Sequence, residues 1–250
     1  MIVSIYRSLF YAMIAGFIIF SGNAFAEQTV IFSVGEWEPF VGETMVNYGP
    51  TAEIMATACK KAGYKAQFEF YPWKRAYKNV KTGKAVATFP WARTEERAIE
   101  VLFPETPLMI SKEKFFYLKE KFPIGLTINK FEDLKSYKMV GTLGYWYEEP
   151  AKKAGVSIHM VSSADLAWNV LGKGRADVLL ENELVAKADL EKIFGDSANR
   201  FASTKEPFKT ADMFCLFSRV HPDSIEIMKK LDQALKEMSA AGEIERILMK

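Results

Sequence analysis

One arginine of the chain stands in a setting suited to holding a carboxylate. Arg97 follows Thr94, Glu95 and Glu96, and threonine is a preferred residue for capping a short helical turn. A guanidinium presents a planar fork of N–H donors that matches both oxygens of a carboxylate. Arg97 is therefore the first candidate for binding a small acidic ligand, and the alternative is a solvated arginine on the surface of a short helix.

Aromatic residues gather near junctions between predicted strands and the helices that follow them. Such rings can stack on a planar ligand or hold a cation over the ring face. The alternative for each ring is ordinary core packing. The rings at these junctions are Trp37, Trp73, Trp91, Tyr145, Trp146 and Tyr147.

Strands and helices alternate along almost the whole chain, which predicts an α/β fold with mostly parallel sheets. The polar or proline-containing stretches 103–108 and 203–212 are candidate passages between two lobes. The predicted strands are 29–34, 66–71, 86–89, 114–118, 138–141, 157–161, 177–180 and 213–220. The predicted helices are 50–61, 72–81, 145–154, 163–172, 182–193, 222–238 and 242–249, with a helical turn at 94–97.

The composition is that of a globular protein with a sizeable core, since 49% of the residues are apolar. Lysine and arginine number 33 against 31 aspartate and glutamate residues. No basic stripe is present, which argues against a nucleic-acid partner. After residue 26, no apolar run reaches the roughly 20 residues of a membrane span, so we expect the mature protein to be soluble.

The N-terminal residues 1–26 have the pattern of an export signal. Arg7 precedes an apolar run at 8–20, and Ala24-Phe25-Ala26 supplies small residues at a cleavage site. We expect cleavage after Ala26 and a periplasmic mature protein; the alternative is an uncleaved N-terminal anchor.

Few residues of the chain suggest covalent or metal chemistry. Cys59 and Cys215 lie in apolar surroundings and could be two buried thiols or a disulfide in an oxidising compartment. His159 and His221 show no metal-ligand spacing, and no nucleophile elbow or phosphate-binding glycine loop occurs. We expect no metal, no cofactor and no enzymatic activity.

Several segments, taken in order, resemble the family 3 extracellular solute-binding proteins that feed polar amino acid ABC importers. No single segment is specific, but their order and spacing together are. They are 37–40 (WEPF), 83–87 (GKAVA), 94–98 (TEERA), 103–107 (FPETP), 172–177 (GKGRAD) and the helical end 231–248.

The resemblance implies a type II periplasmic binding fold, with two α/β lobes joined by two hinge crossovers. Residues 27–108 and 213–250 would form lobe 1, and residues 109–212 would form lobe 2. Each lobe would hold a mostly parallel sheet flanked by helices, and a ligand would bind at the strand ends in the cleft. The implied partners are a small solute and the membrane permease of an ABC importer, and we expect a monomer.

The resemblance also implies roles for particular residues. Arg97 matches the arginine that grips the carboxylate of the ligand, and Trp37 and Trp91 lie in segments that match cleft loops. Tyr145 and Trp146 replace hydroxyl residues of the family pattern, which puts a standard α-carboxylate pocket in lobe 2 in doubt.

The position that usually carries an aspartate for the ligand ammonium holds Asn182, beside Glu181. Glu181 could supply the missing charge, or the ligand could lack an α-ammonium group.

Two alternatives to an import protein remain. Some relatives are periplasmic dehydratases of small cyclic carboxylic acids, and Glu181 is the available general acid for such chemistry. The chain could also be a sensory input module that acts through a separate partner.

Overall fold

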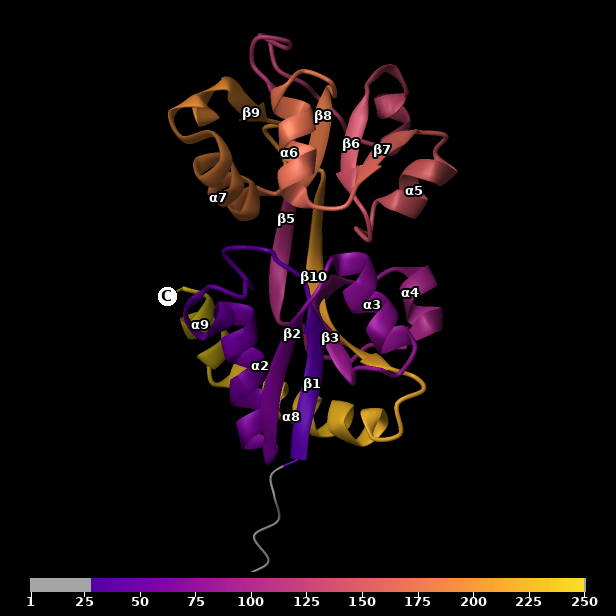
Figure 1. Cartoon of the computed structure of the whole chain (residues 1–250), viewed down its shortest axis with the longest axis vertical. Helices are drawn as coiled ribbons and strands as arrows, with labels where there is room; N and C mark the ends of the chain where they lie inside the picture. The colour runs from indigo at the N-terminus through magenta and orange to yellow at the C-terminus, as the bar shows by residue number, and fades with distance from the viewer. Residues whose placement is uncertain (1–27, 250) are drawn as a thin grey trace, which may run out of the picture.

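The computed structural model describes residues 28–249 and consists of two halves joined by two long strands. The predicted export signal lies outside the described residues. Figure 1 shows β5 (Met109–Leu118) and β10 (Lys209–Ser218) running from one half into the other. Among residues 28–249, no helix is both long and apolar enough to cross a membrane.

The half that holds the start of the chain is built on parallel strands. β1 (Gln28–Val34) pairs with β2 (Tyr64–Phe70) and β3 (Ala87–Ala92). α2 (Pro50–Lys61) packs with α8 (Ser224–Ala240) and α9 (Glu243–Leu248), while α3 (Trp73–Lys81) packs on β1, β3 and β10. The short elements of this half are η1 (Val46–Tyr48), α4 (Glu95–Glu100) and β4 (Val101–Leu102).

The other half repeats this plan with shorter elements. β6 (Met139–Thr142) lies parallel to β7 (Ile158–Val161) and β8 (Val178–Asn182), and α6 (Ala164–Gly172) packs on all three. α7 (Glu183–Phe194) packs on β8 and β5. The remaining elements are η2 (Phe131–Ser136), α5 (Glu148–Lys153), η3 (Gly195–Arg200) and β9 (Phe201–Ser203).

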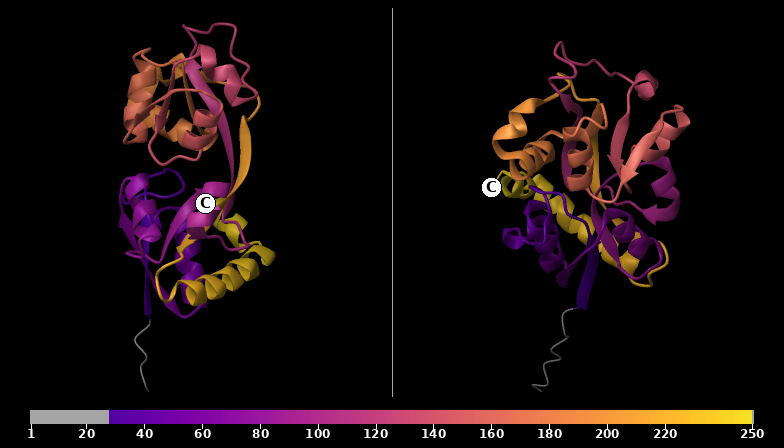
Figure 2. Two further views of the ribbon diagram at one scale, coloured as in Figure 1. Left: turned by 90° about the vertical axis from the view of Figure 1, so that its right-hand side faces the viewer. Right: turned by 45° about the horizontal axis from the view of Figure 1, so that its top comes forward.

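The two connections between the halves are strands that pair with each other. β5 and β10 are antiparallel, with Lys209 opposite Glu113 and Met213 opposite Met109. β10 also pairs with β3, and β5 with β8, so one sheet runs through both halves in the order β2-β1-β3-β10-β5-β8-β6-β7. Off this path, β4 pairs with β10 and β9 with β5. The sequence prediction began these strands four or five residues too late, at 213 and 114, because the connecting segments are polar. Figure 2 shows the pair from the side.

Each half has its own packed interior. Phe32, Phe68 and Phe89 pack with ring centroids 5.5–5.6 Å apart in the first half. In the second half Trp168 is fully buried and its indole N–H donates to Asp189 at 2.8 Å. Cys59 on α2 and Cys215 on β10 are both buried and are not joined in a disulfide.

Candidate functional site

A pocket lies between the two halves, where β3 and β6 end. Its free volume is about 40 Å³, which holds a few waters if each needs roughly 10–15 Å³. An amino-acid-sized ligand therefore requires the halves to open or the walls to rearrange. The lining residues are Trp37, Trp73, Pro90, Trp91, Ala92, Arg97, Glu113, Gly144, Tyr145, Trp146 and Met213.

The Arg97 guanidinium links the two halves at this pocket. Nη1 donates to the Ala92 carbonyl at 2.8 Å, and Nη2 donates to the Gly144 carbonyl of the other half at 2.9 Å. The guanidinium carbon lies 4.7 Å from the centroid of the Trp91 ring. The backbone N–H of Arg97 donates to the Thr94 hydroxyl, so Thr94 caps α4 as predicted. Burial lowers the pKa of Arg97 to about 10, so the side chain stays charged at neutral pH.

Two tryptophans form the wall on the side of the first half. The rings of Trp73 and Trp91 meet edge to face, with centroids 5.2 Å apart. The Trp91 indole donates to Thr88, and that of Trp73 donates to the Glu36 carbonyl. A Cβ on Gly35 would lie 2.5 Å from the Trp73 ring, so only glycine allows this close packing. All of these contacts lie within the first half, so the positions of the two rings do not depend on the other half.

The opposite wall comes from the loop after β6. The predicted helix 145–154 begins later, at Glu148, which leaves Tyr145 and Trp146 in a loop facing the pocket. Gly144 before them has a φ of 93°, and a Cβ there would lie 3.1 Å from the Lys74 backbone nitrogen of the first half. The glycine therefore lets the two halves approach closely.

Glu113 on the hinge strand β5 also lines the pocket and was missed by the sequence analysis. It is only 6% exposed, and the Trp146 indole donates to its Oε2 at 2.6 Å. Burial raises the pKa of Glu113 to about 7, although Trp146 and the cations Lys209 and Arg97 act against the shift. The Nζ of Lys209 lies 3.5 Å from the Trp146 ring centroid. Local pattern gave no signal for Glu113, because its neighbours are also polar.

Glu181 is close to the pocket but does not form its wall. The indole of Trp37, from the first half, donates to Oε1 at 3.2 Å, and the Tyr145 hydroxyl donates to Oε2 at 3.1 Å. The Asn182 N–H also donates to Oε1, and the residue is 3% exposed. Burial, followed by the charge of Asp189, raises the pKa of Glu181 to about 8. Glu181 thus joins the halves behind two rings that face the pocket.

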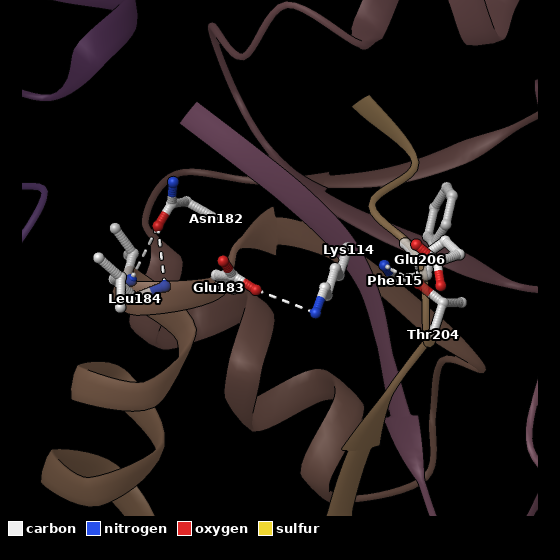
Figure 3. Close-up of polar contacts among 8 residues, drawn as sticks. Lys114, Phe115, Asn182, Glu183, Leu184, Thr204 and Glu206 are labelled. Carbon is white, nitrogen blue, oxygen red and sulfur yellow. Dashed lines mark hydrogen bonds and ion pairs between the residues drawn. The ribbon is translucent and has the colours of Figure 1, made fainter. Parts of the chain in front are cut away.

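Asn182 is the N-cap of α7, as Figure 3 shows. Its Oδ1 accepts from the Leu184 and Val185 amides at 2.9 and 3.2 Å. Its amide group donates to the Ser111 hydroxyl of β5 at 2.9 Å. Asn182 is absent from the lining of the pocket, and its amide group serves the start of the helix.

Replacing Asn182 with alanine should lower the free energy of unfolding by about 1–3 kcal/mol, because a cap and a buried hydrogen bond are lost. Urea denaturation measures this. Ser163→Ala is the matched control, since Ser163 caps α6 from an exposed position with one bond of 3.4 Å to Leu166. A loss of ligand affinity in Asn182→Ala with unchanged stability would instead assign Asn182 to the binding site.

Two wider grooves share walls with the pocket, and both are rich in carboxylates. One has a volume of about 500 Å³ and the other about 460 Å³. The first groove is lined by five carboxylates and one cation, Lys192. The carboxylates are those of Glu36, Glu38, Glu43, Asp165 and Asp189. Carboxylates line the second groove at Glu96, Glu100, Glu148 and Glu149, with Lys74 and Arg97 as its cations. In the second groove Lys153 and Lys81 pair with Glu96 and Glu100, so the excess of negative charge belongs to the first groove. That excess favours the approach of positively charged groups.

Solved structures with the same fold include a sensor domain, an amino acid-binding protein and the precursor of an enzyme. A histidine kinase sensor domain with similarity to periplasmic binding proteins matches with a TM-score of 0.75 and 14% identity, covering 88% of this chain and 95% of that one. An ancestral arginine-binding protein bound to arginine matches with a TM-score of 0.72 and 24% identity, and the match covers 88% of this chain and 96% of that one. The ancestral amino acid-binding protein AncCDT-1, a precursor of cyclohexadienyl dehydratase, matches with a TM-score of 0.69 and 20% identity. This match covers 88% of this chain and 93% of that one. At these identities the likeness establishes the fold.

The sequence itself identifies the family. No protein of curated function matches it significantly. The family model of bacterial extracellular solute-binding proteins, family 3, matches residues 30–250, which is almost all of the chain. The chain therefore belongs to the family 3 bacterial extracellular solute-binding proteins.

Proposed function

We propose that this protein captures a small carboxylate-bearing solute of the amino acid class in the cleft and delivers it to the permease of an ABC importer. The observation that carries the proposal is the position of Arg97. Its guanidinium lies in the pocket wall and already bonds carbonyls of both halves. A carboxylate placed between the halves would accept hydrogen bonds from the same planar fork.

The electrostatics of the cleft favour an amino acid over a simple organic acid. The groove that has five carboxylates and one lysine in its lining would repel a ligand with net negative charge on its approach. A zwitterionic or basic amino acid carries the cationic group that this field attracts. The relative solved with arginine bound supports the same ligand class.

The proposal includes the location and the motion of the protein. The chain would be exported, cleaved after Ala26, and act as a periplasmic monomer without a nucleic-acid partner. Lobe 1 would comprise 27–108 and 213–250, and lobe 2 would comprise 109–212. The two lobes would open and close about the paired strands β5 and β10.

A thermal-shift screen of amino acids, amines and small organic acids tests the proposal. A ligand that binds only the folded protein should raise the melting temperature. At a concentration of 100 times its Kd, such a ligand stabilises the folded protein by about 2.7 kcal/mol. Intrinsic fluorescence should change with the same ligand, because four tryptophans line the pocket. Isothermal titration then gives the stoichiometry, expected to be one per chain. Stabilisation by amines alone, with no carboxylate-bearing compound active, would contradict the proposal.

A dehydratase function is the second candidate. Its support is the pKa of Glu181, raised to about 8, because a protonated carboxyl at neutral pH is what a general acid requires. The hydrogen bonds from Trp37 and Tyr145 hold this carboxyl behind the pocket wall. Product formation from a small cyclic carboxylic acid, lost in Glu181→Gln, would favour the enzyme over the binding protein.

A further inference from the structure

Glu113 is a buried carboxyl group that faces the pocket from the hinge. It lies opposite Lys209 of β10 on β5, one of the two strands that run from one half into the other (Figure 1). It lines the same pocket as Arg97. Its hydrogen-bond donors are the Trp146 indole and the Ser111 hydroxyl. Among the ion pairs formed by residues 28–249, none includes Glu113.

The nearby cations do not form direct contacts with this carboxyl group. The Nζ of Lys209 lies over the Trp146 ring, and the two Arg97 hydrogen bonds go to backbone carbonyls. A carboxylate that is taken out of water without a direct cationic partner costs free energy. A positively charged group entering the pocket would lower that cost, so Glu113 gains most from a cationic ligand group.

Glu181 is less suited to the same task, although the family pattern points to its neighbourhood. Three donors already occupy its two oxygens, and the rings of Trp37 and Tyr145 separate it from the pocket. A cationic group could reach it only by displacing the Trp37 or Tyr145 donor. Glu113 is directly in the wall of a pocket small enough to bring it and Arg97 to one head group.

We propose that Glu113 binds the ammonium group of the ligand beside the carboxylate held by Arg97. The ligand class is then a zwitterion with neighbouring opposite charges, the head group of an α-amino acid. The Trp146 N–H fixes the carboxyl group of Glu113 in place. This proposal rests on the proposed function. It assigns recognition of the ligand ammonium group to Glu113 on β5 instead of to Glu181 on β8.

Charged and titratable groups from several elements act on Glu113. Arg97 on α4 and Lys209 on β10 favour its ionised form. Glu181 on β8 and Tyr147 after β6 interact with it unfavourably when they are charged. Ligand ammonium would add to the two favourable cations, so Glu113 should ionise as the ligand binds and release part of a proton near neutral pH.

The test uses L-arginine and L-glutamine, each paired with its counterpart that lacks only the α-amino group, 5-guanidinopentanoic acid and 4-carbamoylbutanoic acid. Isothermal titration gives the affinities for the wild type, Glu113→Gln, Glu113→Asp and Glu181→Gln. In Glu113→Gln we expect roughly 30-fold to 1,000-fold weaker binding of the amino acid, with little change for the counterpart. Glu113→Asp should retain part of the preference for the amino acid over its counterpart, and Glu181→Gln should retain all of this preference.

Three results would overturn the proposal. Glu113→Gln could keep the wild-type preference for the amino acid, or Glu181→Gln could abolish it. The wild type could also bind the counterparts as tightly as the amino acids, which would leave the carboxylate-binding function standing and remove Glu113 from it. If the wild type bound no amino acid in the thermal-shift screen, the amino acid function itself would fail, and this inference with it. Glutamine keeps an acceptor for the Trp146 N–H, so circular dichroism should show an intact fold.

Discussion

Arg97→Ala is expected to weaken binding of the cognate solute by roughly 30-fold to 5,000-fold, the range for removing one partner of a buried charged pair. The ligand carboxylate would lose its planar donor fork, and no other arginine lines the pocket wall. Closure should suffer as well, because Nη2 of Arg97 holds the Gly144 carbonyl of the other half. Isothermal titration of the ligand found in the thermal-shift screen measures the loss.

Two further variants separate recognition from folding. Arg97→Lys keeps the charge but not the fork, so its affinity should lie between those of the wild type and the alanine variant. Arg93→Ala removes an exposed arginine that rests on the Phe103 ring, and it should leave the affinity unchanged. Far-ultraviolet circular dichroism checks that each variant folds. Unchanged affinity in a folded Arg97→Ala protein would exclude Arg97 from the site.

Much of this site could be predicted because it depends on local signals. The Thr94 cap and Arg97 belong to one short segment, and the observed Thr94–Arg97 hydrogen bond follows from capping rules. Trp37, Trp91 and Tyr145 follow or end strands that are parallel within their half. The carboxyl ends of such strands meet at one edge of a sheet, so rings far apart in sequence line one pocket.

Glu113 could not be found in this way, because its position depends on long-range pairing. The antiparallel contact of β5 with β10 joins segments from opposite ends of the second half. Between 109 and 113 the buried positions include the polar Ser111 and Glu113, while the apolar Ile110 is exposed, so the sequence lacks the apolar alternation that would predict a strand. Only the paired strands show that Glu113 faces the same space as Arg97.

Two other differences were within reach of local rules. Proline is tolerated in the first turn of a helix but not in its interior. Pro150 therefore favours the observed start of α5 at Glu148 over the predicted start at 145, which frees Tyr145 and Trp146 for the pocket. Asn182 stands directly before α7, where asparagine is a favoured cap. The family resemblance also makes Asn182 a candidate ligand contact, and the Asn182→Ala variant distinguishes this role from that of a cap.

The ligand-free protein should lose stability as the pH rises from 5 to 8.5. Burial raises the pKa of Glu113 from 4.5 to about 7 and that of Glu181 from 4.5 to about 8. Above pH 4.5 the unfolded chain releases protons that the folded protein still holds, so unfolding becomes more favourable as the pH increases. Each group contributes about 1.4 kcal/mol per pH unit until its folded pKa is passed, giving a loss of several kcal/mol in all.

Urea denaturation at intervals of half a pH unit measures this slope. Glu113→Gln should lose the part of the slope that ends near pH 7, and Glu181→Gln the part that continues to about pH 8. Glu183→Gln is the matched control, because Glu183 lies two residues after Glu181 but forms a partly exposed ion pair with Lys114 at 2.9 Å (Figure 3). A wild-type stability that is flat or rising across this range would show that both carboxyl groups are already ionised in the closed protein. A saturating amino acid should reduce the part of the slope due to Glu113, because an ammonium group beside this carboxyl group lowers its pKa towards that of the unfolded chain.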